Sequence, residues 1–302
     1  MPGDPLIHII GEEEYYRLQK EYPEVIEEVR EKYGLDQSFG TQYAKYLRNT
    51  VKLDFGYSYI NAQPVLEIVI YRMKWTLMIA IPSIIISAVL GGFLGAKAGW
   101  KTGGIFDCAM TPVFLIFNTI PSNCFALIFL IIFAYKTGWF PIAGMTSGGF
   151  HGLEKALDIL WHMALPTIVL TIFRTSSNYL LMKSYVSQIK DEEYILTAVS
   201  KGLSQKKILI RHVVKNAMLP YITTLCMQLG YIFSGSMMVE VIFSWKGMGT
   251  LIYNSVNSKD YPTIQLCFLV ISVCVIVFNF FADVLYLFID PRVKKEYGYD
   301  GN

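Results

Sequence analysis

The sequence predicts an all-α, polytopic helical membrane protein. Of its 302 residues, 53% are hydrophobic and only 17% are charged, whereas an average soluble domain carries about 25% charged residues. Five apolar stretches are each about as long as the roughly 20 residues with which a helix crosses a bilayer. A transmembrane β-barrel is excluded because its strands would alternate apolar and polar residues, and these stretches are continuously apolar.

The five stretches predict five transmembrane helices, at residues 75–96, 109–134, 163–182, 219–239 and 262–288. All five tryptophans lie at or beside the ends of the first four stretches: Trp75, Trp100, Trp139, Trp161 and Trp245. Because indole rings prefer the headgroup layer, we expect them to mark the membrane surfaces. In the second stretch Pro112 and Pro121 interrupt the helix, and Gly91, Gly92, Gly95 and Ala96 in the first predict close helix packing.

Basic residues indicate which connections face the cytoplasm. Residues 183–216 carry seven Lys or Arg and three acids. Lys97 and Lys101 follow the first stretch, and Arg292, Lys294 and Lys295 follow the fifth. By the positive-inside rule these three segments are cytoplasmic, which leaves residues 135–161 and 240–261 outside.

Strict alternation also places residues 1–74 outside, as an extracytoplasmic region that contains a soluble helical pair broken at Pro23. The predicted transmembrane domain comprises residues 75–290, including the cytoplasmic loop 183–216, and residues 291–302 form a cytoplasmic tail.

Within that loop, "DEEYILTAVSKGL" (191–203) predicts a short amphipathic helix. Asp191 is the expected N-cap, and Gly202 suits a left-handed residue after the helix end. Helical spacing places Ile195, Ala198, Val199 and Gly202 on one narrow apolar face. Periodicity alone leaves open whether this face packs on its own bundle, on lipid or on another protein. Its small residues, with no Trp or Phe among them, favour a protein.

A longer segment, "EYILTAVSKGLSQKKILIRHVVKNAMLP" (193–220), resembles the EAA loop of ABC importer permeases, in the form found in the dipeptide, oligopeptide and nickel permease family. Ala198 and Gly202 match its alanine and glycine, and Leu219-Pro220 matches its closing pair. Thr197 replaces the acid of the general pattern, and the spacing to Leu-Pro is longer, as is usual in this branch.

Four further segments resemble the same family in the same order: "DFGYSYINAQPVLEIVIYRM" (54–73), "GWFPIAGM" (138–145), "VEVIFSWKGMGTLIYNSVNSKDYPTIQ" (239–265) and "NFFADVLYLFIDPRVK" (279–294). Lys246 stands where proline is commoner. The resemblance therefore covers nearly the whole chain and implies the ABC importer type I permease fold, with six transmembrane helices in the family. Because the family's first helix precedes a "PGDP" segment and this chain opens "MPGDP", we expect that helix to be missing here.

The resemblance also implies a role and partners. The chain would be a permease subunit in a prokaryotic cytoplasmic membrane, importing peptides or nickel by alternating access. It would form the translocation path with a second homologous permease, couple to two ABC ATPase subunits, and receive substrate from an extracytoplasmic binding protein. The predicted ATPase-coupling residues are Glu193, Tyr194, Thr197, Ala198, Lys201, Gly202 and Leu203.

Several kinds of chemistry are not expected in this chain. Lys101, Lys136 and Lys183 are the lysines that precede Ser or Thr, and none follows Gly, so there is no Walker A motif. Any ATP and Mg²⁺ would be bound by partner ATPase subunits. The histidines and cysteines show no metal-ligand spacing. We therefore expect a transport subunit, not an enzyme, with no catalytic or metal site, no cofactor of its own, lipid around it and no nucleic-acid partner.

Three of the polar residues within the apolar stretches are considered as candidate site residues: Arg174, Asn279 and Asp283. Arg174 either lies on the translocation path, where it could meet a peptide carboxylate, or pairs with an acid or backbone carbonyls inside the bundle, which we favour. Asn279 and Asp283 share one helix face and are interpreted as packing contacts. The alternative function is a self-sufficient secondary transporter that uses all three as an ion relay, but the paired repeats of such folds are not apparent.

Overall fold

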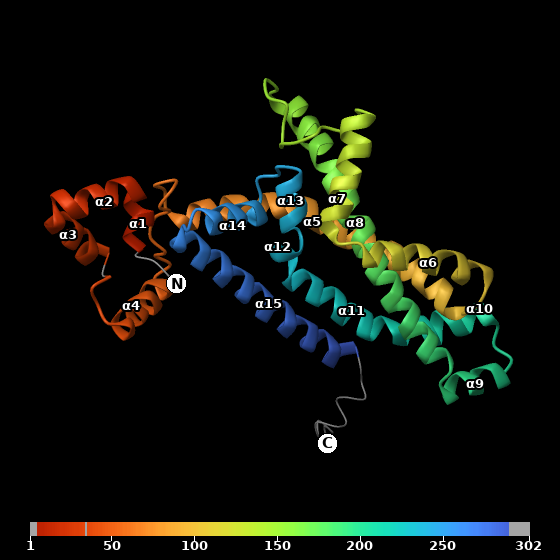
Figure 1. Cartoon of the computed structure of the whole chain (residues 1–302). Helices are drawn as coiled ribbons and strands as arrows, with labels where there is room; N and C mark the ends of the chain where they lie inside the picture. The colour runs from red at the N-terminus through yellow and green to blue at the C-terminus, as the bar shows by residue number, and fades with distance from the viewer. Residues whose placement is uncertain (1–4, 34, 290–302) are drawn as a thin grey trace, which may run out of the picture. The chain divides into compact units, whose positions relative to one another are not determined.

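The computed structural model describes residues 5–33 and 35–289, and this part of the chain is helical (Figure 1). An isolated bridge joins Tyr57 to Pro64, and no strand occurs among the described residues. The predicted tail 291–302, with Arg292, Lys294 and Lys295, lies outside them. The chain divides into two compact units, Met1–Met73 with Leu251–Val270, and Lys74–Thr250 with Ile271–Asn302.

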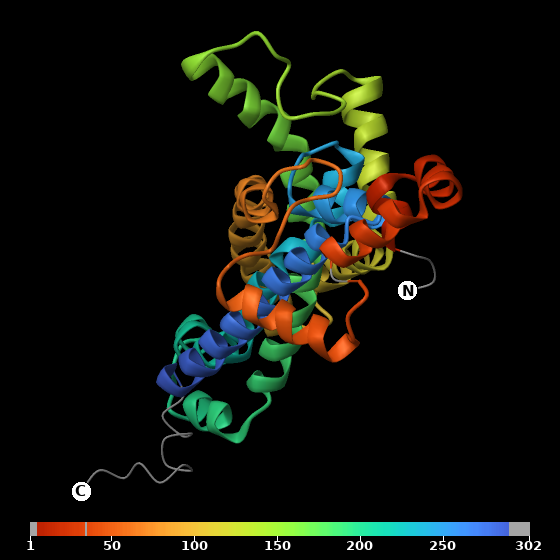
Figure 2. The ribbon, with the colours of Figure 1, turned by 90° about the vertical axis from the view of Figure 1, so that its left-hand side faces the viewer.

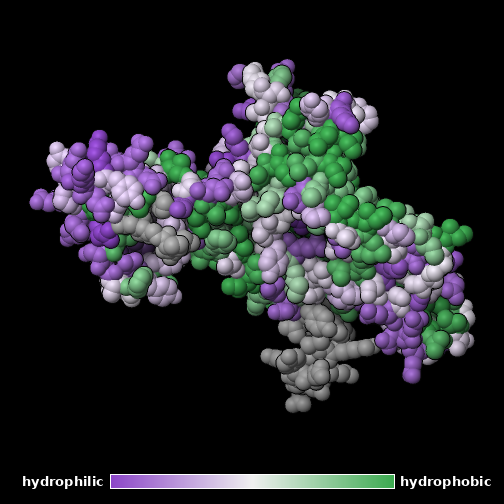
Figure 3. All heavy atoms as spheres, in the orientation of Figure 1, coloured by the Kyte–Doolittle hydropathy of each residue, from purple (hydrophilic) through white to green (hydrophobic). Residues whose placement is uncertain are grey.

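Four short helices open the first unit: α1 (Pro5–Ile10), α2 (Glu12–Glu21), α3 (Pro23–Tyr33) and α4 (Phe39–Val51). The helical break predicted at Pro23 is confirmed, because α2 ends at Glu21 and Pro23 opens α3, where a missing N–H costs nothing. Leu6, Tyr15 and Ile26 form a small core. The outer surface of these helices is hydrophilic (Figure 3).

A buried carboxylate organises the rest of the first unit. Asp260 lies between α14 (Met248–Asn257) and α15 (Tyr261–Ile289). Its oxygens accept hydrogen bonds from Ser58 Oγ at 2.5 Å, Tyr59 N at 3.1 Å and Thr263 Oγ1 at 2.8 Å. The "DFGYSY" segment is thus fixed to residues some 200 positions away in the sequence.

Three helices in the described part of the chain are individually long and apolar enough to cross a membrane: α5 (Val65–Trp100), α8 (Gly152–Lys190) and α15. The second predicted stretch forms a bent pair of helices. Its halves, α6 (Ile105–Thr119) and α7 (Ser122–Phe129) continued by η1 (Leu130–Lys136), meet at an angle of 102°. Pro121 causes the break, because it forces Ile120 into an extended conformation.

The fourth predicted stretch, residues 219–239, is not one continuous helix. It comprises α11 (Lys215–Gly230), α12 (Ile232–Gly235) and most of α13 (Met237–Ile242). The interruptions fall at Tyr231 and Ser236, each directly after a glycine, the weakest helix former apart from proline. The helical class predicted from composition is confirmed. The second stretch is interrupted, as its prolines predicted, whereas the breaks at Tyr231 and Ser236 were not predicted.

Helices α5 and α8 pack very closely, as predicted from the glycines of the first stretch. A Cβ atom added to Gly91, Gly95 or Gly99 would lie 2.5–2.6 Å from atoms of α8, including the carbonyl oxygens of Tyr179 and Lys183. In two perpendicular views, α7 and the first turns of α8 rise on the same side of the bundle (Figures 1 and 2). Hydrophobic residues cover the surface of α7 (Figure 3).

The tryptophans divide into two groups. Trp139 and Trp161 are exposed, as residues at a membrane surface would be. Trp245 is instead fully buried within the protein. Its Nε1 donates to the carbonyl of Trp75 at 2.8 Å, and the two rings meet edge to face at 6.1 Å. Burial with a satisfied N–H makes Trp245 a packing residue.

Candidate functional site

The predicted loop helix exists as α9 (Glu193–Ser200), and its C-terminal end has the expected form. Gly202 adopts φ +74°, the left-handed conformation that glycine tolerates best. The Gly202 N–H donates to the Val199 carbonyl at 2.9 Å and the Leu203 N–H to the Ala198 carbonyl at 3.4 Å. These two bonds are the Schellman pattern, which satisfies carbonyls that the helix end would leave free.

The N-terminal end differs from the prediction. Helix α8 continues to Lys190, and Asp191 is the C-cap of that helix. Glu192 is therefore the N-cap of α9, and its side chain makes no capping hydrogen bond. The assignment of Asp191 as N-cap is wrong because the preceding helix extends to the residue that would have started the new one.

One face of α9 is anchored in its own chain. Ile195 and Ala198 are buried in a cluster that includes Met182 of α8, Ile208 of α10 (Gln205–Ile208) and Val213 of η2 (Leu209–Val214). Leu203 packs against the same cluster. The small side chain of Ala198 therefore serves internal packing, and α9 is attached to α8 and η2.

The other face of α9 is open. Leu196 is 63% exposed and Val199, predicted to lie with Ile195 and Ala198, is 46% exposed. Around this apolar pair lie exposed polar and small residues: Glu193, Tyr194, Thr197, Ser200, Lys201 and Gly202. Tyr194 is held at the edge by a hydrogen bond that its Oη accepts from Asn216 Nδ2 at 2.8 Å. The sequence did not single out Leu196, although its place on the face opposite Ile195 and Ala198 follows from helical spacing.

A partly buried ion pair joins α6 to the end of α8 next to this loop. Lys183 Nζ lies 2.5 Å from Asp107 Oδ1 and 2.9 Å from Thr111 Oγ1. Asp107 also accepts hydrogen bonds from Thr111 Oγ1 at 2.7 Å and Gly103 N at 3.0 Å. Lys183 was predicted to face the cytoplasm, but its partner Asp107, 76 positions earlier, gave no local signal.

A chain of polar side chains connects three helices within the bundle. Gln228 of α11 donates to Asn178 Oδ1 of α8 at 2.6 Å, and Asn178 Nδ2 donates to Ser87 Oγ of α5 at 3.3 Å. Gln228 Oε1 is buried without a hydrogen-bond partner. Hydrogen bonds of this kind hold transmembrane helices together. Neither Asn178 nor Gln228 was predicted as a functional residue, although each is a polar residue inside an apolar stretch.

Glu240 of α13 is a second buried carboxylate that sequence reasoning missed. Its Oε1 accepts from Thr76 Oγ1 at 2.7 Å and Ser236 Oγ at 3.0 Å, and its Oε2 accepts from Thr250 N at 3.1 Å. Gly247 is required beside it, because a Cβ there would lie 2.5 Å from Glu240 Oε2. Glu240 therefore connects the start of α5 with the predicted outer loop 240–261.

The three predicted intramembrane polar residues do not form a relay. Arg174 of α8 is partly buried, and it has no hydrogen-bond or ion-pair partner in the described part of the chain. A Cβ atom added to Gly235 would lie 3.4 Å from Arg174 Nη2. Asn279 is partly buried and Asp283 is exposed, one helical turn apart on α15. No contact among the described residues joins either of them to Arg174.

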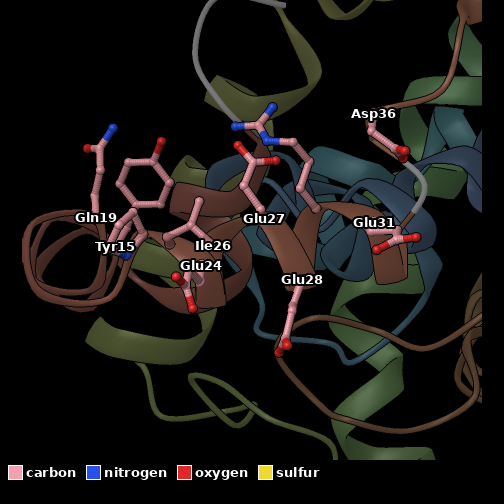
Figure 4. Close-up of a pocket in the computed structure, with 10 residues that line it drawn as sticks. Tyr15, Gln19, Glu24, Ile26, Glu27, Glu28, Glu31 and Asp36 are labelled. Atoms are coloured by element: carbon pink, nitrogen blue, oxygen red, sulfur yellow. The ribbon is translucent and has the colours of Figure 1, made fainter.

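An acidic hollow of about 590 Å³ lies between α2 and α3. Figure 4 shows that its carboxylates do not converge, since Glu27 and Glu28 point away from one another. No group of three or more His, Cys, Asp or Glu side chains in residues 5–33 and 35–289 could hold a metal ion. The hollow is therefore a solvated acidic surface.

Comparison with known proteins gives the family of the chain. Residues 87–295, which include α9 and the polar chain, match the family described as "Binding-protein-dependent transport system inner membrane component". This chain belongs to that family. It is therefore a permease of an ABC importer, a multi-pass protein of a prokaryotic cytoplasmic membrane, and members of the family are transport subunits that need no cofactor of their own.

Individual relatives of the permease match along most of their length. It is 32% identical to the peptidoglycan transport system permease protein YejB of Agrobacterium fabrum, over 91% of this chain and 77% of the relative. It is 29% identical to the dipeptide transport system permease protein DppB of Alkalihalophilus pseudofirmus, over 97% and 91%. It is also 32% identical to the oligopeptide transport system permease protein AppB of Bacillus subtilis, over 89% and 84%.

Proposed function

We propose that the permease belongs to an ATP-driven importer of peptides. The observation that supports this proposal is the set of relatives, whose names refer to dipeptide, oligopeptide and peptidoglycan transport. Nickel, the other substrate that the sequence motifs suggested, receives no support from these three relatives. A binding protein outside the membrane would deliver the peptide, and a second homologous permease would complete the path.

The two faces of α9 support a role in coupling. Ile195 and Ala198 fix the helix to the bundle, while Leu196 and Val199 present an apolar pair to the outside. On the cytoplasmic side such a pair fits a groove in an ATPase subunit, which would bind the ATP and Mg²⁺. Because α9 is fixed to α8, movement of the ATPases would be passed to the permease, and the pair of permeases would alternate between inward-open and outward-open states.

The alternative of a self-sufficient secondary transporter has less support. It needs an ion relay, and the structure joins Arg174 to neither Asn279 nor Asp283 among the described residues. Arg174 remains available for a peptide carboxylate on the path, because it has no partner within the described part of its own chain.

Co-purification with variants of α9 tests the coupling proposal. The tagged permease is expressed with the ATPase genes beside it and isolated in mild detergent. Leu196→Glu with Val199→Glu should reduce the bound ATPase at least about 10-fold, because two apolar side chains that the interface would bury are each worth about 1.5–3 kcal/mol. Leu157→Glu, at an exposed residue near the start of α8, is the matched control and should leave it bound.

The result that contradicts the proposal is a wild-type permease that never brings down an ATPase, or a double variant that binds ATPase as well as the control does. Uptake of labelled dipeptide, oligopeptide and Ni²⁺ by the complete importer then separates the substrates. Uptake of Ni²⁺ alone would contradict the peptide assignment while leaving the coupling role intact.

A further inference from the structure

An apolar groove of about 790 Å³ runs along the C-terminal half of α5, between this helix and the segment formed by η2 and α11. On the α5 side its wall includes Val89 and Phe93, which are 65% and 70% exposed. On the other side it includes Ile210, Met218 and Leu225. The groove is thus open to the surroundings and almost wholly apolar along its length.

One end of the groove is basic. Lys97 near the end of α5, Lys101 just after that helix, and Lys206 of α10 line that end beside Trp100. None of the three lysines forms an ion pair with an acid among the described residues. Lys97 Nζ lies over the Phe106 ring, 4.2 Å from the ring centroid. By the positive-inside rule this end lies at the cytoplasmic surface.

The dimensions of the groove match one leaflet of a bilayer. On the α5 side the wall extends from Ala88 to Trp100 at the end of the helix, which is about 18 Å at 1.5 Å per residue. Half of the hydrocarbon core is about 15 Å thick, so the apolar part can accommodate an acyl chain while the lysines reach headgroup level. Trp100 lies at the same level, where indole rings are favoured.

Small residues in a groove are also typical of a docking site for another helix, but here a contact within the same chain accounts for them. A Cβ on Gly92 would lie 3.3 Å from the Tyr221 ring, and Tyr221 Oη donates to the Ala88 carbonyl at 2.8 Å. The small residues therefore allow α11 of the same chain to approach. A partner helix laid in the groove would also have to satisfy three ammonium groups at its mouth.

We propose that this groove binds an anionic phospholipid of the cytoplasmic leaflet. The phosphate lies among Lys97, Lys101 and Lys206, and an acyl chain follows the apolar walls toward Ala88 and Leu225. Basic pockets between transmembrane helices on the cytoplasmic side have this chemistry. The inference rests on the family's membrane location and holds whatever substrate the importer carries.

Native mass spectrometry of the complete importer, released from nanodiscs that contain equal amounts of phosphatidylglycerol and phosphatidylcholine, tests the charge requirement. The wild type should retain phosphatidylglycerol in preference, with each lysine contributing a factor of about 5. The triple variant Lys97→Gln, Lys101→Gln, Lys206→Gln should lose this preference. The matched control, Lys190→Gln, Lys207→Gln, Lys215→Gln, removes as many charges from the same loop region outside the groove and should keep it. Equal retention of both lipids by the wild type, or an unchanged preference in the groove variant, overturns the proposal.

A photo-crosslinking amino acid at Val89 tests the occupant without removing any charge. In a membrane that contains phosphatidylglycerol, an adduct with the mass of that lipid supports the proposal. A crosslink to a second permease subunit or to another protein shows instead that a helix covers the groove, and overturns it.

Discussion

Glu240 is a fully buried carboxylate whose oxygens accept hydrogen bonds from Thr76, Ser236 and Thr250. The variant Glu240→Leu should lower the free energy of unfolding by about 2–5 kcal/mol, because it leaves buried donors without an acceptor. Glu240→Gln keeps the shape and one acceptor oxygen, so its loss should be smaller. The measurement is thermal or denaturant unfolding of the purified permease in detergent, followed by tryptophan fluorescence.

The matched control for this acid is Glu154→Leu on α8, where the side chain is exposed. An exposed substitution away from any network changes stability by about 0.5 kcal/mol or less. Equal unfolding transitions for the leucine variants at 240 and 154 would show that the Glu240 hydrogen bonds contribute nothing to the fold.

The role of a single residue could be predicted from the sequence where it depends on the local backbone conformation. Gly202 was expected to end α9 in the left-handed conformation, and it does. Asp191 was misassigned because α8 continues to Lys190, so that Asp191 is the C-cap of α8 and Glu192 is the N-cap of α9. Glu240 could not be recognised, because its partner Thr76 lies 164 positions away and the contact exists only after the helices pack.

At the scale of helices, α5 and α8 approach each other very closely. A Cβ on Gly95 would lie 2.5 Å from the Tyr179 carbonyl and 2.9 Å from Met182 Cβ. The variant Gly95→Leu should therefore force the helices apart and lower the free energy of unfolding by about 3 kcal/mol or more, as overpacking does. Loss of monodisperse protein in size-exclusion chromatography and a lower unfolding midpoint would both report this.

A helical glycine with free space provides the control for Gly95. Gly40 in α4 has its nearest atom 4.0 Å from an added Cβ and is exposed. The variant Gly40→Leu should be neutral or stabilise the protein by up to about 1 kcal/mol, because leucine is the better helix former. A Gly95 variant as stable as the Gly40 variant would contradict the close packing of α5 and α8.

The sequence predicted helices better than it predicted their continuity. Apolar length identified α5, α8 and α15, and α5 and α8 remain continuous although Pro82 and Pro166 lie inside them. Pro121 signalled an interruption, but the 102° bend depends on where α7 packs. The only local feature that indicates the break at Tyr231 is the glycine before it. A glycine inside an apolar stretch can equally be a packing residue, as Gly95 is.

At the scale of the whole molecule, α8 is the longest helix in the described part of the chain. It is a single helix of 39 residues, about 58 Å long at 1.5 Å per residue, and it leads directly into α9. The ion pair of Lys183 with Asp107 fastens α6 to α8 near this end. Movement of α9 should therefore be transmitted to both α8 and the bent pair of α6 and α7.

A double variant separates this transmission from folding. Removing Lys183 alone would leave a partly buried Asp107 without its cation, which should lower the free energy of unfolding by about 3–5 kcal/mol. The double variant Asp107→Asn with Lys183→Met removes both charges and should recover most of that stability. In the complete importer in proteoliposomes, we expect the folded double variant to hydrolyse ATP but to take up several-fold less peptide for each ATP. Lys136→Met, an exposed lysine at the end of η1, should leave that ratio at the wild-type value. A folded double variant with the wild-type ratio would show that α6 need not follow α8, and that the bend at Pro121 plays no part in transmitting the movement.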